Sequence, residues 1–285
     1  MTYLVESILK SMSSVNKPQR LFITNLFATL MLFQGKANFR NLSRYSHYCE
    51  RTFSRWYHRG FSFLKFNTIL MNHYFTDNEQ IAAIDASFIS KSGKKTEGLA
   101  RFFNGARSIA EKGLEISLIC LVDLKSNTAF SLDARQTIDI ESKTRIDLYC
   151  DHINDVATSL KKLNILYLAA DAFYSKFKFV NQVVDCGLHI IGKLRIDANF
   201  SWIYEGEYSG KGRPKKFKGK VDIHKQLNLF MDKIELEDGL KLYSSVVYSH
   251  SLKRKIKVVV VEFNRSDKVG HIILFSTDLM ISAKN

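Results

Sequence analysis

The stretches Ile81-Ala82-Ala83-Ile84-Asp85-Ala86-Ser87-Phe88 and Leu166-Tyr167-Leu168-Ala169-Ala170-Asp171-Ala172-Phe173-Tyr174 share one layout. In each, an apolar run delivers an aspartate, and alanine and then an aromatic residue follow it. A carboxylate in an apolar strand is costly to desolvate unless something compensates it, and a divalent metal between two such groups is a common compensation. The repeated layout therefore predicts two carboxylates that meet at a metal site.

The segments around these aspartates alternate between strand and helix patterns. Apolar runs separated by turn residues predict three strands in an antiparallel meander at Ile81–Ile89, Leu114–Val122 and Thr128–Leu132. A helical period then follows from Ile146 to Leu160. The remaining predictions are a strand at Ile165–Ala170, a helix with Ser175 as its N-cap and a strand at Leu188–Leu194.

This order of elements predicts an α/β fold, a mixed sheet with helices on its faces. The first and fourth strands can then lie side by side, which would bring Asp85 near Asp171. Ligand groups in such sheets often lie where strand ends meet and connections diverge, and Asp171 stands at such a point.

The composition favours a polyanionic partner. The chain has 285 residues, enough for one large or two smaller domains. It carries 42 Lys and Arg against 28 Asp and Glu, a formal net charge of +14. Nucleic acid is the leading candidate partner. A membrane surface is a weaker candidate, because the basic residues are spread over several segments rather than gathered on one lipid-binding helix.

Other classes of protein lack their signatures in this sequence. The four cysteines are widely spaced, without the pairs of a zinc ribbon or of a disulfide-rich secreted module. No apolar stretch is long enough for a membrane span and no cleavable signal peptide stands out, so a cytoplasmic location is expected. No Ser-His-Asp, Cys-His or glycine-rich phosphate-loop motif stands out either.

The N-terminal part has a helical pattern. An amphipathic helix is predicted from Pro18 to Gly35, ending at the glycine, and shorter helices at Ala37–Arg44 and Glu50–Arg59. In the last of these, a row of arginines four residues apart suits docking on DNA: Arg51, Arg55 and Arg59. The alternative interpretation is a solvated face of a small helical bundle.

From Trp202 to Asp278 the pattern changes to short alternating strands. Within this part, the segment Lys211–Lys220 has six basic residues in ten, with two glycines and a proline, and predicts a flexible basic loop. Contact with DNA phosphates is the favoured interpretation for Lys211, Arg213, Lys215, Lys216 and Lys218. A solvated hairpin tip is the alternative.

The predicted chemistry is that of a two-metal site. Carboxylates that hold two divalent ions activate a water or a sugar hydroxyl and stabilise the leaving oxygen of a phosphodiester. Mg²⁺ suits hard oxygen ligands, with Mn²⁺ as a substitute, and a third acid is normally needed. Taken singly, each aspartate is better explained as a strand-end cap or turn former, and only the repeat changes that balance.

Three motifs together resemble the DDE transposases of bacterial insertion sequences: Ala83–Ser87, Glu111–Glu115 and Ala169–Tyr174. The resemblance implies an RNase H-like catalytic core at 76–200, in which Asp85 and Asp171 match the first two metal-binding acids. It further implies a helical DNA-binding region at 1–75 and a β-rich insertion subdomain with a return strand at 201–278. The implied partner is double-stranded DNA, both element ends and target, bound by a homo-oligomer at the bacterial nucleoid.

The resemblance breaks at the third acid. In the branch of that family with a β-rich insertion, the third acid is a glutamate. It lies in a Tyr-x2-Arg-x3-Glu-x6-Lys pattern, shortly after a strand similar to Ile272–Asp278. That pattern is absent from this sequence, so residues 279–285 are interpreted as a truncated end and no third acid is assigned.

Three hypotheses follow. The first is that the chain is the larger part of a transposase, which cuts element ends and joins the freed 3′ hydroxyl to target DNA. The second is a catalytically inactive DNA-binding protein that competes for element ends. The third is a stand-alone RNase H-like nuclease.

Overall fold

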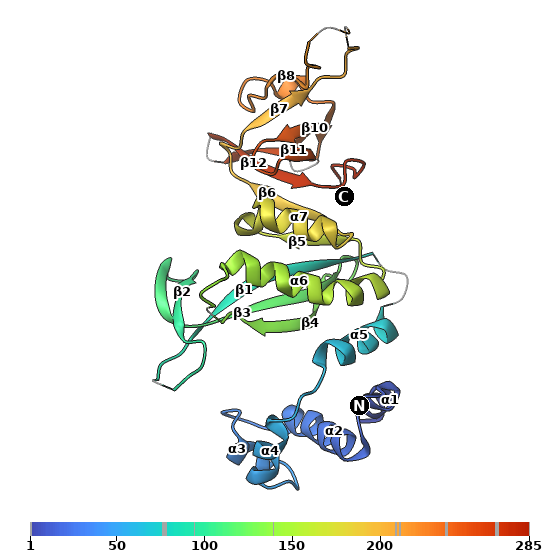
Figure 1. Cartoon of the computed structure of the whole chain (residues 1–285), viewed down its shortest axis with the longest axis vertical. Helices are drawn as coiled ribbons and strands as arrows, with labels where there is room; N and C mark the ends of the chain where they lie inside the picture. The colour runs from blue at the N-terminus through green and yellow to red at the C-terminus, as the bar shows by residue number, and fades with distance from the viewer. Residues whose placement is uncertain are drawn as a thin grey trace. The chain divides into compact units, whose positions relative to one another are not determined.

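The computed structural model describes residues 2–75, 79–93, 95–138, 140–208, 210, 212–236, 239–265 and 268–284. The chain forms two compact units, Met1–Asp77 and Asn78–Asn285 (Figure 1). The finer division of the second unit near residue 200 stays a prediction.

The described part of the first unit is entirely helical. Its helices are α1 (Thr2–Ser11), α2 (Lys17–Leu32), α3 (Phe39–Arg44), α4 (Glu50–Tyr57) and α5 (Phe63–Tyr74). They share an apolar core in which Phe22 stacks on Trp56, with ring centroids 5.0 Å apart, and contacts Phe53 edge-on. The sequence did not lead us to expect α1 and α5, although α1 buries Ile8 and Leu9 in this core.

The predicted end of the second helix was wrong. The helix stops at Leu32, and Phe33 caps it in an extended conformation by donating its backbone N–H to Thr29. Gly35, at φ +85°, lies beyond the cap. The start of the helix is fixed by Asn16, whose side chain accepts a hydrogen bond from the Gln19 N–H.

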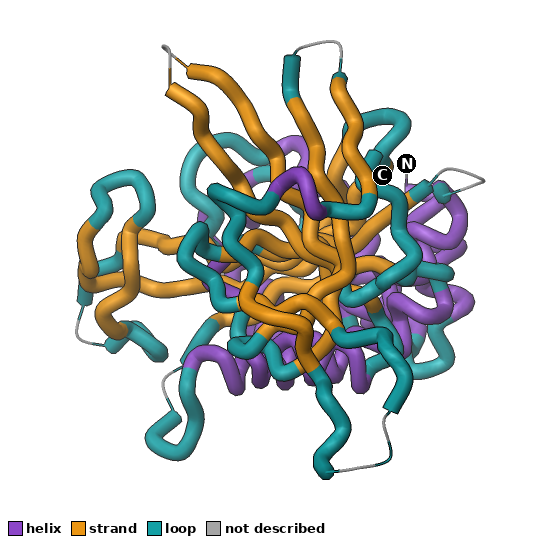
Figure 2. Tube along the Cα trace, turned by 90° about the horizontal axis from the view of Figure 1, so that it is seen from above, coloured by secondary structure: helices purple, strands orange, loops and turns teal. Residues whose placement is uncertain are grey.

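The second unit is built on one large mixed sheet (Figures 1 and 2). Its strands are β1 (Gln80–Ser90), β2 (Ala100–Asn104), β3 (Ile109–Asp123), β4 (Thr128–Gln136), β5 (Tyr167–Ala170), β6 (His189–Leu194), β7 (Phe200–Ile203), β8 (Phe217–Lys220), β9 (Asp232–Glu235), β10 (Lys241–Ser249), β11 (Arg254–Arg265) and β12 (Lys268–Ser276). The order across the sheet is β2-β3-β1-β5-β6-β12-β11-β10-β7-β8, with β4 paired to β3 and β9 to β10.

The predicted neighbours in this sheet are confirmed. β3 pairs antiparallel with both β1 and β4, which is the expected meander. β1 pairs parallel with β5, and β5 with β6, so the first and fourth predicted strands are adjacent. The predicted α/β class and mixed sheet therefore hold.

The β-rich part continues the same sheet. β12 pairs antiparallel with β6, with Ile273 opposite Leu194, and β11, β10, β7 and β8 follow outward. The side chain of Thr277 fixes this junction, because its hydroxyl accepts a hydrogen bond from the Ile190 N–H at 3.0 Å. The 3₁₀ turn η1 (Ala172–Tyr174) leads from β5 to the next helix, and a second such turn, η2 (Leu227–Leu229), joins β8 to β9.

Both α-helices in the described part of this unit, α6 (Arg145–Lys162) and α7 (Phe177–Asp185), lie against one face of the sheet (Figure 1). α6 begins with a capping box between Thr144 and Asp147. The predicted N-cap of α7 was wrong: Lys176 occupies that position without a side-chain hydrogen bond. Ser175 instead ends η1, and its hydroxyl donates to the Lys193 carbonyl oxygen.

The two faces of the sheet differ in burial. Along β3 the odd-numbered residues from Gly113 to Asp123 are buried, whereas the even-numbered residues between them are only half-buried. We call the side that carries the odd-numbered residues and packs on α6 the covered face, and the opposite side the open face. No helix of the described second unit covers the open face.

In the described part of the chain, no helix is both long enough and apolar enough to cross a membrane.

Candidate functional site

Asp85 and Asp171 each directly follow a residue that takes part in the pairing of β1 with β5. The register places Ala83 opposite Ala169 and Ile84 opposite Ala170. Continued by one residue, it places Asp85 opposite Asp171, across strands that lie about 4.8 Å apart. Because side chains alternate along a strand, both aspartates belong to the open face, whereas Ile84 is buried on the covered face.

Each aspartate is exposed and uses one oxygen locally. Asp85 Oδ1 accepts a hydrogen bond from the Ala86 N–H at 2.8 Å, and Asp171 Oδ1 accepts one from the Phe173 N–H at 2.9 Å. The second bond explains the local geometry, because Asp171 caps the 3₁₀ turn η1. In the described part of the chain, no hydrogen bond to the other oxygen of either carboxylate is present.

A buried phenol lies within the electrostatic reach of both aspartates. Burial raises the pKa of Tyr174 far above its usual value, and the charges of Asp85 and Asp171 add to the rise. Tyr174 packs between Tyr149 and Phe179, and among the described residues its buried hydroxyl has no hydrogen-bond partner.

Two exposed carboxylates on neighbouring strands are hard oxygen ligands of the kind that Mg²⁺ and Mn²⁺ accept. The donor set therefore fits such an ion in part. Within the described residues, no group of three or more His, Cys, Asp or Glu side chains is placed to hold a metal. Such ions also accept water and substrate oxygens as further ligands.

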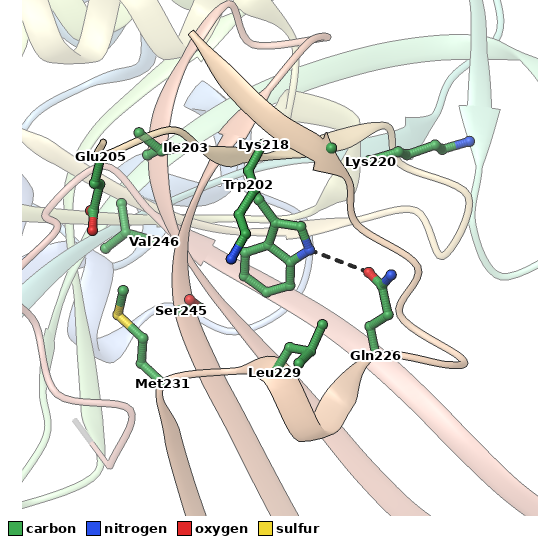
Figure 3. Close-up of a pocket in the computed structure, with 11 residues that line it drawn as sticks. Trp202, Ile203, Glu205, Lys218, Lys220, Gln226, Leu229, Met231, Ser245 and Val246 are labelled. Carbon is green, nitrogen blue, oxygen red and sulfur yellow. Dashed lines mark hydrogen bonds between the residues drawn. The ribbon is translucent and has the colours of Figure 1, made fainter. Parts of the chain in front are cut away.

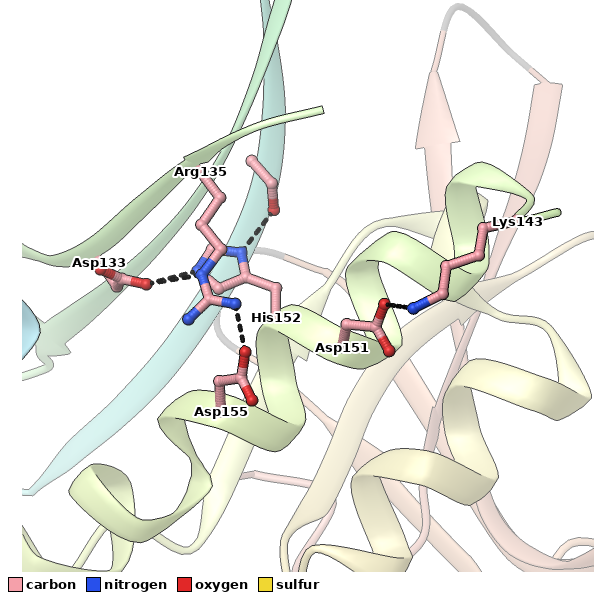
Figure 4. Close-up of polar contacts among 7 residues, drawn as sticks. Asp133, Arg135, Lys143, Asp151, His152 and Asp155 are labelled. Atoms are coloured by element: carbon pink, nitrogen blue, oxygen red, sulfur yellow. Dashed lines mark hydrogen bonds and ion pairs between the residues drawn. The ribbon is translucent and has the colours of Figure 1, made fainter. Parts of the chain in front are cut away.

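The covered face carries a polar cluster that sequence reasoning missed (Figure 4). His152 of α6 is 1% exposed, and its Nδ1 lies 2.9 Å from the Ser117 hydroxyl of β3. Its Nε2 lies 3.2 Å from Asp133 Oδ2, off the line of a hydrogen bond. Asp133 also accepts a hydrogen bond from Arg135 at 3.0 Å, and Arg135 reaches Asp155 at 2.5 Å.

This cluster has the residue types of a nucleophile, a base and an acid, but it is closed to substrate. Ser117 and His152 are buried between the helix and the sheet. Burial alone would raise the pKa of Asp133, but the side-chain contacts with His152 and Arg135 outweigh it and lower that pKa. One signal in the sequence does exist: His152 falls on the apolar stripe of α6, between Tyr149 and Val156, where a polar side chain must find a partner.

A second buried acid on the covered face is likewise paired. Glu115 is 6% exposed and accepts a hydrogen bond from the Tyr149 hydroxyl at 2.6 Å. Arg145 lies 3.8 Å away. Burial first, and then the bond to Glu115, raise the pKa of Tyr149 strongly. Glu115 is thus held on the side of the sheet opposite to Asp85.

The predicted DNA-binding residues in the first unit are exposed. α3 and α4 form two short helices joined by a turn, and Arg51 and Arg55 lie one turn apart on α4. Arg59 lies two residues beyond the end of α4, with its guanidinium 4.2 Å from the centre of the Trp56 ring. Exposed arginines suit both of the predicted interpretations, contact with DNA and a solvated face.

The basic segment of the second unit is only partly a loop. Residues 217–220 form β8, which pairs with β7, so the prediction of a loop through Lys220 was wrong there. Arg213 and Lys216 line an open cavity of about 490 Å³ that also includes Phe217 and Tyr248. Lys215 lies over the Tyr204 ring, Lys218 is exposed on β8, and Lys211 lies outside the described residues.

Comparison with known proteins gives a solved structure but no family. No family model matches the chain, and no curated protein matches it. Endonuclease V of Ciona intestinalis, solved in complex with a 24mer DNA containing an inosine followed by a ribo-adenosine, is similar over 70% of this chain and 71% of its own. The sequence identity is 10% and the TM-score 0.30, values that assign neither a family nor an activity to this chain.

Proposed function

We propose that this protein processes DNA in the manner of an insertion-sequence transposase, with Asp85 and Asp171 as its metal-binding carboxylates. The observation that supports the proposal is the parallel β1–β5 register, in which Ile84 and Ala170, the residues just before the two aspartates, are paired. The net charge of +14 supports a polyanionic substrate. A DNA-bound homo-oligomer and an RNase H-like core belong to the same proposal.

The two carboxylates would bind Mg²⁺, or Mn²⁺ in its place, through the oxygens that are not engaged in local hydrogen bonds. When bound between carboxylates and phosphates, such ions activate a water or a 3′ hydroxyl and stabilise the leaving oxygen of a phosphodiester. The backbone N–H groups of Ala86 and Phe173 hold the other oxygens and so fix the orientation of both side chains.

DNA phosphates would be held by exposed cationic side chains. The arginines of α4 and the basic residues near β8 are exposed and suit phosphate contacts, which give affinity without sequence preference.

The test is DNA cleavage by the full chain with Asp85→Asn and Asp171→Asn variants. The substrate is supercoiled plasmid DNA with Mg²⁺ or Mn²⁺, and Asp197→Asn is the matched control because Asp197 is an exposed aspartate paired with Arg195. We expect nicking that requires the metal, loss of about 100-fold or more in each site variant, and no change in the control. Nicking that survives both site substitutions would contradict the proposal.

A joining assay separates transposase chemistry from simple nuclease chemistry. A labelled duplex with a free 3′ hydroxyl is incubated with a target plasmid, and covalent transfer of the label is measured. Metal-dependent transfer supports the transposase proposal. Cleavage without any transfer supports the stand-alone nuclease instead.

One observation favours a second candidate function, DNA binding without catalysis. In the described part of the chain, no third metal-ligating side chain joins the two aspartates. Salt-sensitive DNA binding without cleavage in either metal would establish this alternative. Arg55→Ala should then weaken binding to all sequences alike and reduce the slope of log affinity against log salt by about 1.

A further inference from the structure

The outer part of the sheet contains a cavity that the proposed cleavage chemistry does not use. It has a volume of about 420 Å³ and lies among β7, β8, β10 and η2 (Figure 3). That volume lies within the range of small-ligand pockets, near its lower end. It has room for one flat ring system and a substituent.

The floor of the cavity carries a polar group that lacks a partner. Ser245 of β10 is 0% exposed, and no hydrogen-bond partner reaches its hydroxyl in the described structure. Figure 3 shows this hydroxyl between Met231 and the Trp202 ring. Because an unpaired buried hydroxyl is costly, a group that bonds to it from within the cavity recovers that cost.

The walls of the cavity are apolar and include a fixed aromatic ring. The indole N–H of Trp202 donates to Gln226 Oε1 at 3.2 Å, and the same oxygen accepts the Asp222 N–H at 3.0 Å. Leu229 and Met231, which also line the cavity, are 56% and 67% exposed. A held indole and exposed apolar side chains suit a planar ring that stacks.

The rim of the cavity is cationic. Lys218 and Lys220 of β8 line it, against a single acid, Glu205. Figure 3 shows Lys218 extending beside the Trp202 indole. The ligand that matches these features has a flat ring with hydrogen-bonding edges and an attached anion.

We propose that this cavity binds one nucleotide unit, with its base on Trp202, a base edge on the Ser245 hydroxyl and its phosphate at Lys218. The nucleotide is either free or an unpaired residue of a DNA strand, since both present the same chemistry. The proposal does not depend on catalysis by Asp85 and Asp171.

The chain offers its own probe for this site. Its two tryptophans are Trp56 and Trp202, so Trp56→Phe leaves only the cavity indole to fluoresce. In this background, titration with 2′-deoxyadenosine 5′-monophosphate should quench Trp202 saturably, with a dissociation constant below about 1 mM. Deoxyadenosine, which lacks the phosphate, should bind at least tenfold more weakly.

Variants then test the assigned contacts. Ser245→Ala and Lys218→Ala should each weaken binding about fivefold to tenfold, whereas Lys255→Ala, at the other cavity, should not. Leu229→Glu should abolish binding, because it places a negative charge at the rim on a side chain too exposed to matter for folding. This variant keeps the test informative if Ser245→Ala fails to fold.

A single-stranded deoxyadenylate hexamer and the corresponding duplex distinguish the two sources. Equal affinity for mononucleotide and hexamer indicates a free nucleotide, and tighter binding of the hexamer than of the duplex indicates an unpaired residue of a strand. The proposal would be overturned if neither the mononucleotide nor the hexamer gave saturable quenching. It would also be overturned if Ser245→Ala and Lys218→Ala each left binding unchanged. Asp85→Asn should leave quenching unchanged, so failure of cleavage and failure of this site are separable.

Discussion

Polar residues on the two faces of the sheet around β1 differ in burial and in hydrogen-bond partners. On the covered face, Glu115, His152 and Asp133 are withdrawn from water and lie against hydroxyl or charged partners. On the open face, Asp85 and Asp171 are exposed, and each has one oxygen in a local backbone hydrogen bond. A polar group that is buried and paired contributes to folding, whereas an exposed and unpaired one is free to bind a ligand.

The largest expected effect concerns the partner of His152. Asp133→Ala leaves a buried imidazole and a partly exposed guanidinium without their shared carboxylate. We expect the free energy of unfolding to fall by about 3 kcal/mol, the low end for breaking a buried pair, because Arg135 keeps Asp155. Urea unfolding followed by circular dichroism measures the change.

The control for this substitution is Asp85→Ala on the open face. An exposed aspartate without a charged partner should change the free energy of unfolding by no more than about 0.5 kcal/mol. Equal losses of unfolding free energy in Asp133→Ala and Asp85→Ala would contradict the distinction between the two faces.

The next effect concerns the buried Glu115. Tyr149→Phe keeps the ring contacts with Tyr174 but removes the hydroxyl that donates to the carboxylate. A hydrogen bond to a charged group contributes about 2 kcal/mol, and we expect a loss of that size in urea unfolding. The matched control is Tyr57→Phe, since that ring is exposed. A loss below about 0.5 kcal/mol would mean that water replaces the missing hydroxyl.

The sequence predicted the pairing of β1 with β5 but not the polar contacts of the covered face, and there is a physical reason. The repeat around Asp85 and Asp171 is a local pattern, and parallel pairing of two such strands follows from the order of elements. The contact of Ser117 with His152 spans 35 residues and joins a strand to a helix. Local periodicity does not contain such a pairing, although the place of His152 on an apolar stripe marks the need for one.

The dependence on tertiary contacts also explains the helices that the sequence did not predict and the element ends that it placed wrongly. α1 and α5 are stabilised by burial in the common core of the first unit rather than by strong local signals. The end of α2 depends on a cap by the Phe33 backbone. The end of the basic loop depends on the pairing of β8 with β7. These contacts are tertiary, and helix boundaries are the part of a pattern least fixed by local sequence.

The reaction rates of the native cysteines allow the two faces to be compared without any substitution. Cys120 lies on the open face, half-buried, and burial together with the Asp85 charge raises its pKa. Cys150 lies on α6 under the covered face, and burial raises its pKa to about 11. Iodoacetamide at about pH 8 should therefore modify Cys120 at least about tenfold faster than Cys150 in the folded protein. Mass spectrometry of proteolytic peptides gives both rates.

The exposed Cys49 serves as the reference for that experiment. Its pKa is lowered, chiefly by the hydrogen bond with the Thr52 side chain, so it should react first. Faster modification of Cys150 than of Cys120 would mean that the helix layer opens more readily than the open face, contrary to the comparison. In urea the three rates should converge, because unfolding removes the differences in burial.

The smallest expected effect is a pH dependence in the helix layer itself. Asp147 of α6 pairs with Lys178 of α7, and that contact, followed by bonds from Thr144, lowers the pKa of Asp147 from its usual 3.8 to about 2. Because the folded pKa lies below the unfolded one, this contribution to stability is present above pH 3.8 and is lost as pH falls toward 2. Lys178 is exposed, so solvent screens the pair and keeps the effect modest. Asp147→Asn should flatten the fall in urea midpoint across this pH range, whereas Asp151→Asn, one turn further along α6, should not. An unchanged acid limb in Asp147→Asn would contradict the assignment, because it would show that the titration of Asp147 does not contribute to the loss of stability in acid.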